Sequence, residues 1–162
     1  MNIAVRPVTD ELVLTRDIAA PRERVFAAWT DVRQAARWWV PRDFTTLSCE
    51  MDVRPGGVWR RRMRAPGGAV VTKHGVYREV VAPERLAFTY ITEGATGVID
   101  PETLVTLTFA DLGGRTRLTL RHDNLPGADL SAAHQVAWGT YLPRLAAVAA
   151  GADPGPDPHS AS

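Results

Sequence analysis

The sequence of residues 18–39, IAAPRERVFAAWTDVRQAARWW, predicts two short helices in succession. A first helix is predicted over residues 21–30, because Pro21 suits the first turn of a helix, where its missing N–H costs nothing. Asp31 breaks this helix and can cap a second one over residues 32–39. The first helix has one apolar face, formed by Val25, Phe26 and Trp29. Two helices this early in a chain are distinctive.

Strand-like alternation surrounds this helix pair. Residues 11–18 place apolar side chains at period two, which is typical of a half-buried strand. Turns rich in Gly, Pro and Asp separate the later segments. Further strands are predicted over residues 44–53, 58–64, 70–80, 86–90, 104–109 and 116–122. One face of the first of these is expected to carry Leu47, Cys49, Met51 and Val53.

Residues 130–150 show the period of a long helix, which Pro143 is expected to kink. The whole order predicts an α+β fold in which a curved antiparallel sheet surrounds a long C-terminal helix. We expect one domain over residues 11–150, preceded by a lead-in over residues 1–10. Residues 151–162 are rich in Pro, Gly, Asp and Ser and are predicted to form a disordered tail.

Composition excludes several classes of partner. The chain has 162 residues, with 19 Lys plus Arg against 18 Asp plus Glu, so a net charge of +1 indicates neither nucleic-acid nor membrane binding. No apolar run approaches the roughly 18 residues that span a bilayer. The single cysteine, Cys49, excludes an intramolecular disulfide and a cysteine-rich metal site. A cytoplasmic protein is expected, because the start of the chain lacks the pattern of a secretory signal.

Short motifs occur along the chain in an order that is typical of one superfamily. They are residues 18–26 (IAAPRERVF), 38–41 (WWVP), 52–59 (DVRPGGVW), 75–80 (GVYREV) and 83–89 (PERLAFT), followed by Trp138, Leu142 and Leu145. Over residues 11–150 the chain thereby resembles the START/Bet v 1-like (SRPBCC, polyketide cyclase-like) superfamily. Within it, the chain is most similar to the family named for the activator of heat-shock protein 90 ATPase. The resemblance implies a helix-grip fold with a cavity, and Arg61 departs from the family's usual apolar residue.

Seven aromatic side chains are expected to converge on the space between the sheet and the long helix. Aromatic residues combine large apolar faces with polar tips, which suits a pocket for a flat or hydrophobic ligand. The alternative is that they are ordinary core, since large apolar residues fill interiors. The candidate lining residues are Trp38, Trp39, Trp59, Phe88, Tyr90, Trp138 and Tyr141, together with Met63, which shares a strand face with Trp59.

Three polar side chains are expected near the same space. Strand alternation points Arg61 to the same inner face as Trp59 and Met63. Because a buried guanidinium is unfavourable unless it is paired, either a carboxylate or an anionic ligand should meet it. Alternatively, its stem packs and its head reaches water. His122 shares a face with apolar strand residues, and His134 lies one helical turn before Trp138. These two histidines could transfer protons, or they could be hydrogen-bonded structural residues.

The leading functional hypothesis is the binding of a small hydrophobic or aromatic molecule, without a cofactor or metal. No nucleophile elbow, phosphate loop, dinucleotide fingerprint or metal-ligand spacing occurs in the sequence. A cofactor-free cyclase or hydrolase that uses His122, His134 or Arg61 in the same pocket is the alternative. The resemblance adds a module that binds a chaperone and regulates its ATPase, and a self-resistance protein that sequesters a natural product. No feature of the sequence indicates an oligomeric state.

Overall fold

The computed structural model describes residues 9–40, 43–94, 97 and 99–152. Residues 1–8 of the predicted lead-in and residues 153–162 of the predicted tail lie outside this part, and β1 already begins at Thr9. The described elements follow the predicted order. They are β1 (Thr9–Ile18), α1 (Arg22–Thr30), α2 (Val32–Trp38), β2 (Thr45–Met51), β3 (Val58–Arg64), β4 (Val70–Val81), β5 (Arg85–Glu93), β6 (Thr103–Asp111), β7 (Thr116–Pro126) and α3 (Ala128–Ala149).

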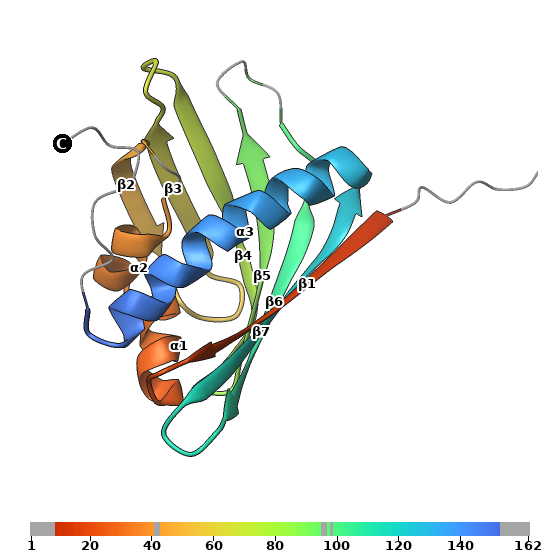
Figure 1. The fold of residues 1–162 in the computed structure, drawn as a ribbon. Coiled ribbons are helices and arrows are strands. Elements are labelled where there is room, and N and C mark those ends of the chain that lie inside the picture. The colour runs from red at the N-terminus through yellow and green to blue at the C-terminus, as the bar shows by residue number, and fades with distance from the viewer. Residues whose placement is uncertain (1–8, 41–42, 95–96, 98, 153–162) are drawn as a thin grey trace, which may run out of the picture.

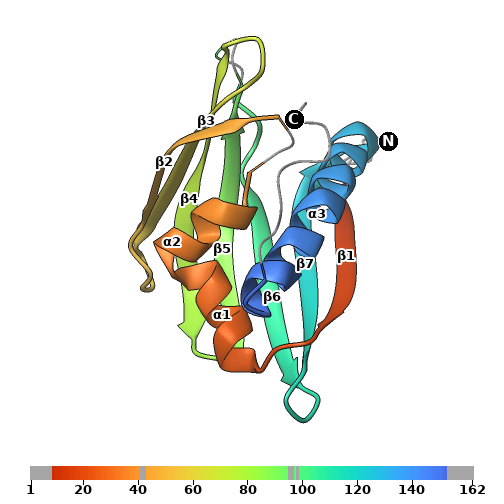
Figure 2. The ribbon, with the colours of Figure 1, turned by 60° about the vertical axis from the view of Figure 1, so that its left-hand side comes forward.

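The strands form one antiparallel sheet in the order β1-β7-β6-β5-β4-β3-β2. All three helices lie on the same side of this curved sheet, and α3 runs across it (Figures 1 and 2). The pair α1 and α2 packs against α3 toward its C-terminal end (Figure 1). The predicted α+β helix-grip fold is therefore confirmed, and the apolar core lies between the sheet and the helices.

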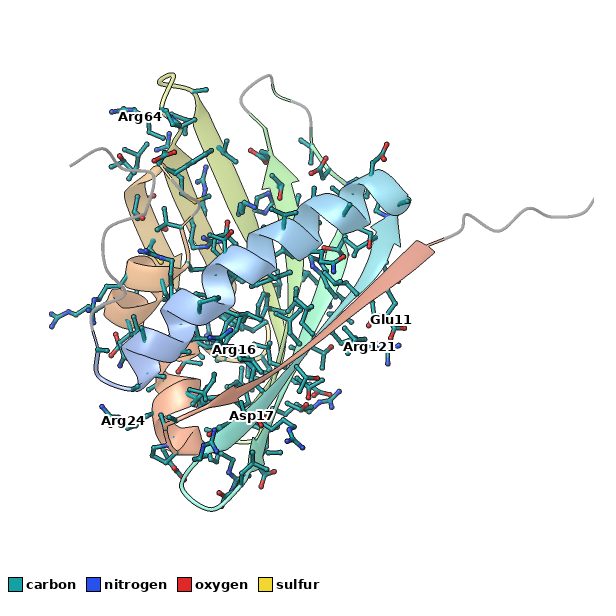
Figure 3. The ribbon with its side chains drawn as sticks, in the orientation of Figure 1. Glu11, Arg16, Asp17, Arg24, Arg64 and Arg121 are labelled. Carbon is teal, nitrogen blue, oxygen red and sulfur yellow. The ribbon has the colours of Figure 1, made fainter. Side chains whose placement is uncertain are left out.

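The edge strand β1 is joined to β7 by ion pairs as well as by backbone hydrogen bonds. Arg117 Nε lies 2.9 Å from an oxygen of Asp17, and Arg121 Nη2 lies 2.8 Å from an oxygen of Glu11. Figure 3 shows Glu11 and Arg121 beside one another at this edge of the sheet. Exposed pairs of this kind contribute only about 0–1 kcal/mol each. The interior of the fold contributes more.

The two short helices begin and end close to where the sequence predicts. Pro21 occupies the N-cap position of α1, and the side chain of Asp31 caps α2 by accepting a 2.9 Å hydrogen bond from the Arg33 N–H. Helix α2 ends at Trp38, one residue before the predicted boundary. Trp39 therefore follows the helix directly and, like Trp38, is buried.

The two strands after the helix pair differ in regularity. Strand β3 alternates without interruption, so Trp59, Arg61 and Met63 are buried and the residues between them are exposed. Strand β2 contains a bulge between Thr46 and Ser48. The prediction that Leu47 shares the inner face is wrong, because the extra residue at the bulge turns its side chain toward solvent.

Helix α3 continues through Pro143 to Ala149. Because Pro143 has no N–H, the carbonyl of Gly139 lacks its usual donor four residues along. Gly139 itself weakens a helix interior by roughly 0.5–1 kcal/mol relative to alanine. The middle of α3 is thus its weakest part, and Tyr141 lies within it.

Gly75 on β4 permits a close approach between three strands. It lies opposite Trp59 in the register of β3 and β4, and the Trp59 indole N–H passes over it to donate to the Thr89 carbonyl of β5 at 3.1 Å. A Cβ atom at this position would lie 1.8 Å from the Thr89 oxygen and 2.7 Å from the indole nitrogen. Only glycine leaves room for this hydrogen bond.

Replacing Gly75 with alanine should destabilise the fold by at least about 2 kcal/mol, because backbone and a buried indole must both shift. The matched control is Gly67→Ala in the β3–β4 turn, where an added Cβ meets no atom within 4 Å. Urea unfolding measures both variants. Equal stabilities for the two variants would contradict this account of Gly75.

Candidate ligand-binding site

Five tryptophans pack together between the helices and the sheet. The ring of Trp39 is stacked between Trp38 and Trp59, with centroid distances of 5.3 and 5.1 Å and interplanar angles of 8° and 23°. Trp29 of α1 meets Trp38 edge-on at 4.5 Å, and Trp138 of α3 lies 5.9 Å from Trp29. Such aromatic pairs contribute about 0.5–1.5 kcal/mol each beyond the area they bury. The cluster joins all three helices to β3.

The indole N–H groups of this cluster have different partners. Trp38 donates to the Ala28 carbonyl at 2.7 Å, which ties α2 back to α1. The indole nitrogens of Trp29 and Trp39 are buried without a hydrogen-bond partner. Buried donors are normally satisfied, so these two nitrogens are exceptions that need an explanation.

His122 of β7 is held by hydrogen bonds on both ring nitrogens. Its Nδ1 accepts from the Trp138 indole N–H at 3.1 Å, so the proton of the neutral ring lies on Nε2. Nε2 lies 2.7 Å from the hydroxyl of Thr103, which in turn donates to the Tyr90 carbonyl at 2.8 Å. The chain of donors and acceptors is complete when His122 is neutral. This arrangement favours the structural interpretation of His122.

His134 of α3 lies beside His122, with ring centroids 4.5 Å apart. Burial, then the neighbouring His134 and then Lys73 lower the pKa of His122 to about 3. Burial, followed by Lys73, lowers the pKa of His134 to about 4. Both rings are neutral in the folded protein at pH 5–7, whereas histidines in the unfolded chain bind protons below about pH 6.5.

Stability should therefore fall as the pH falls from 6.5 toward 4, because the unfolded chain binds protons that the folded protein does not. At pH 5 the free energy of unfolding should be lower than at pH 7 by up to about 2 kcal/mol for each of the two histidines. Urea unfolding at pH 7 and pH 5 measures it. The drop should shrink in His134→Gln, which removes one of the two buried rings. An unchanged drop in His134→Gln would contradict the assignment.

Arg61 is buried in the site, with 1% of its surface exposed. Its guanidinium carbon lies 3.9 Å from the centre of the Trp39 ring. Nη1 donates to the Trp39 carbonyl, and Nη2 lies 3.4 Å from the Tyr90 hydroxyl, while Nε has no partner. The head of Arg61 does not reach water, so the alternative in which it snorkels is wrong.

Lys73 of β4 is a second buried cation in this region. Its Nζ lies 5.2 Å from the centre of the Tyr90 ring, and burial is the main cause that lowers its pKa. The hydroxyl of Tyr141, from α3, is buried near both cations; it has no hydrogen-bond partner at ordinary distance, although Arg61 lies near enough to interact with it. Burial raises the pKa of Tyr141, so this hydroxyl is protonated at neutral pH.

Every predicted lining residue is buried in the layer between sheet and helices. The structure brings them into one connected set: Trp38, Trp39, Trp59, Arg61, Met63, Phe88, Tyr90, His122, His134, Trp138 and Tyr141. Lys73, Trp29 and Thr103 also belong to it, although the sequence prediction omits them. Lys73 could have been found by counting in steps of two from Tyr77, which places both on the inner face of β4.

The family of activator of Hsp90 ATPase homolog 1-like proteins matches residues 19–150. The chain belongs to this family. No curated protein matches the chain.

Solved structures of similar proteins agree with this assignment. A protein from Chromobacterium violaceum is 28% identical with a TM-score of 0.75, and the match covers 86% of this chain and 96% of that one. The AHSA1 protein from Silicibacter pomeroyi is 26% identical with a TM-score of 0.76, covering 87% and 98%. A solution structure from Arthrobacter aurescens, at 23% identity and a TM-score of 0.76, covers 94% and 93% and shows the shared fold.

The hollows found in the described part of this family member lie away from the tryptophan cluster. Two lie on the outer face of β4–β7, with volumes of about 330 and 410 Å³ and with Arg85, Leu104 and Thr106 in common. Another, of about 260 Å³, lies beside Arg24 and Arg37 where the three helices meet. Within the described ranges, no group of three His, Cys, Asp or Glu residues could hold a metal ion. No described helix is long and apolar enough to cross a membrane.

Proposed function

We propose that this protein binds a small hydrophobic or aromatic molecule in the layer between α3 and the sheet. The helix-grip fold of its family commonly binds hydrophobic ligands there. Aromatic faces from α2, β3, β5 and α3 line this layer, and such faces suit flat apolar molecules.

The observation that carries the proposal is a pair of unpartnered polar atoms among these aromatic faces. The indole N–H of Trp39 and the hydroxyl of Tyr141 are both buried without a hydrogen-bond partner at ordinary distance, although Tyr90 lies near enough to interact with Trp39 and Arg61 with Tyr141. An unsatisfied buried group costs about 1–3 kcal/mol, which folding alone gives no reason to retain. A ligand with polar atoms at its edge would satisfy them.

The weak middle of α3 supports a route for the ligand. Gly139 and Pro143 flank Tyr141; Pro143 lacks the N–H that would donate to the Gly139 carbonyl, and Gly139 lowers the stability of the helix at this level. Segments with weakened backbone hydrogen bonds open more easily than the core around them. Displacement of α3 near Tyr141 would expose the layer without disturbing the sheet.

The other hypotheses have less support in the site. Both nitrogens of His122 are occupied by Trp138 and Thr103, which argues against a proton shuttle in a cyclase or hydrolase. Regulation of a chaperone ATPase stays a prediction from the family resemblance. Sequestration of a natural product is a special case of the proposed binding.

The uncharged fluorescent dye N-phenyl-1-naphthylamine tests the proposal. We expect saturable binding at one site, with a gain in dye emission and a loss of tryptophan emission through energy transfer from the cluster. Tyr141→Leu should weaken binding about fivefold through loss of an aromatic contact, whereas Thr140→Ala, its neighbour on α3, should not. Absence of saturable binding, or binding that leaves tryptophan emission unchanged, would overturn the proposal.

A further inference from the structure

We infer that the ligand carries an anionic group, which Arg61 and Lys73 bind together from neighbouring strands. This inference rests on the proposed function and specifies the chemical class of the ligand as a hydrophobic or aromatic acid. The charge, the hydrogen-bond capacity and the register of the buried residues carry it.

The first observation is the register of β3 and β4. Arg61 and Lys73 lie directly opposite one another, and both side chains point to the inner face. Only 1% of Arg61 and 9% of Lys73 is exposed. Like charges on directly opposed residues destabilise a sheet, and a buried charge is costly unless an opposite charge meets it. Two such cations side by side therefore require compensation.

The second observation is that the neighbours of these cations supply no opposite charge. Cys49 lies opposite Arg61 on β2, and burial raises the pKa of its thiol. Burial likewise raises the pKa of the Tyr90 and Tyr141 phenols, so these groups are neutral. Among the described residues, no carboxylate lies within 4 Å of either cation. Asp100 acts on Lys73 only from farther away.

The third observation is that the unused polar atoms can all donate a hydrogen bond, although the Tyr141 hydroxyl can also accept one. Arg61 Nε, the Trp39 indole nitrogen and the Tyr141 hydroxyl lack partners at ordinary distance, and Lys73 Nζ lies 5.2 Å from the centre of the Tyr90 ring. The acceptors that face Arg61 are already engaged by its Nη atoms. A group that complements several donors and two positive charges is an acceptor that bears negative charge. Carboxylate, sulfonate, phosphate and ionised phenol share this chemistry.

Stability of the fold does not require two unpaired cations, Arg61 and Lys73, side by side in the interior. Replacing buried charges by apolar residues of similar volume is often neutral or stabilising, so two unpaired cations weaken the fold unless they serve binding. The aromatic rings around them indicate that the anion is attached to an apolar body. Trp39 contacts Arg61, Tyr90 contacts both cations, and both rings contact the rest of the cluster.

A pair of dyes that differ by one charge tests the inference. 8-Anilinonaphthalene-1-sulfonate is N-phenyl-1-naphthylamine with an added sulfonate, so the difference between their affinities reports the anionic group. We expect the sulfonate dye to bind the native protein at least about tenfold more tightly than the neutral dye, because one charge-assisted hydrogen bond contributes about this much affinity. Arg61→Met and Lys73→Met should each remove about tenfold of this preference, measured as the ratio of the affinities of the two dyes for the same variant.

Arg62→Met is the matched control, because it removes the same charge from β3 on the exposed face. It should leave the preference intact. Lys73→Met should also raise the melting temperature of the dye-free protein, a readout that remains if Arg61→Met does not fold. Equal affinities for the two dyes, or the same loss in Arg62→Met, would overturn the inference. Stabilisation by sodium phosphate or chloride as strong as that by the sulfonate dye would also overturn it, in favour of an inorganic anion.

The two levels of the proposal fail differently. If the neutral dye binds as proposed and the sulfonate dye binds no more tightly, the hydrophobic site stands and the anionic inference falls. If neither dye binds, the proposed function itself falls, and the inference with it.

Discussion

The position of Trp39 determines how the interior of this protein is assembled. Its ring is stacked between Trp38 and Trp59, which fixes the end of α2 against β3. Because α2 ends at Trp38, the carbonyl of Trp39 remains available and accepts a hydrogen bond from Arg61. The same ring lies under the guanidinium of Arg61. One residue thus joins the helix pair to the sheet and holds a cation in the interior.

The interior consequently has two parts with different chemistry. Toward α1 and α2, indole rings pack on one another and provide the stability that such a core supplies. Toward the facing strands β3 and β4, the inner residues include Arg61 and Lys73, and the titratable groups beside them are neutral. Functional sites commonly reduce stability, and the second part has the composition of such a site. The aromatic part supplies the rigid frame in which the cations are held.

The spacing of apolar residues, together with the turn and helix-capping residues between the segments, predicts most of the fold. Local patterns predict the order of the elements and the helix pair before Pro41. They also predict that Arg61 points to the inner face of its strand, and no tertiary contact reverses these patterns. Leu47 escapes prediction because a one-residue bulge in β2 has no marker in the sequence. Bulges depend on how two strands pair, which a single strand does not specify.

The site was less predictable than the fold for a similar reason. Convergence of the aromatic residues could be expected, but the pairing of Arg61 with Lys73 depends on the register across the turn between β3 and β4. The bonds that hold His122 join residues far apart in sequence. Sequence patterns assign side chains to faces of a strand, whereas contacts across strands decide which of them act together.

The titration of Lys73 tests the central claim most directly. Lys73 is the only lysine in the chain, so protein labelled with ¹³C at lysine Cε has a single lysine signal. In the free protein, burial should hold the pKa of this group below its usual value, as measured by NMR across a pH series. With 8-anilinonaphthalene-1-sulfonate bound, the pKa should rise, because an opposite charge beside the ammonium favours its charged form. A bound sulfonate that leaves the pKa of Lys73 unchanged would contradict the account.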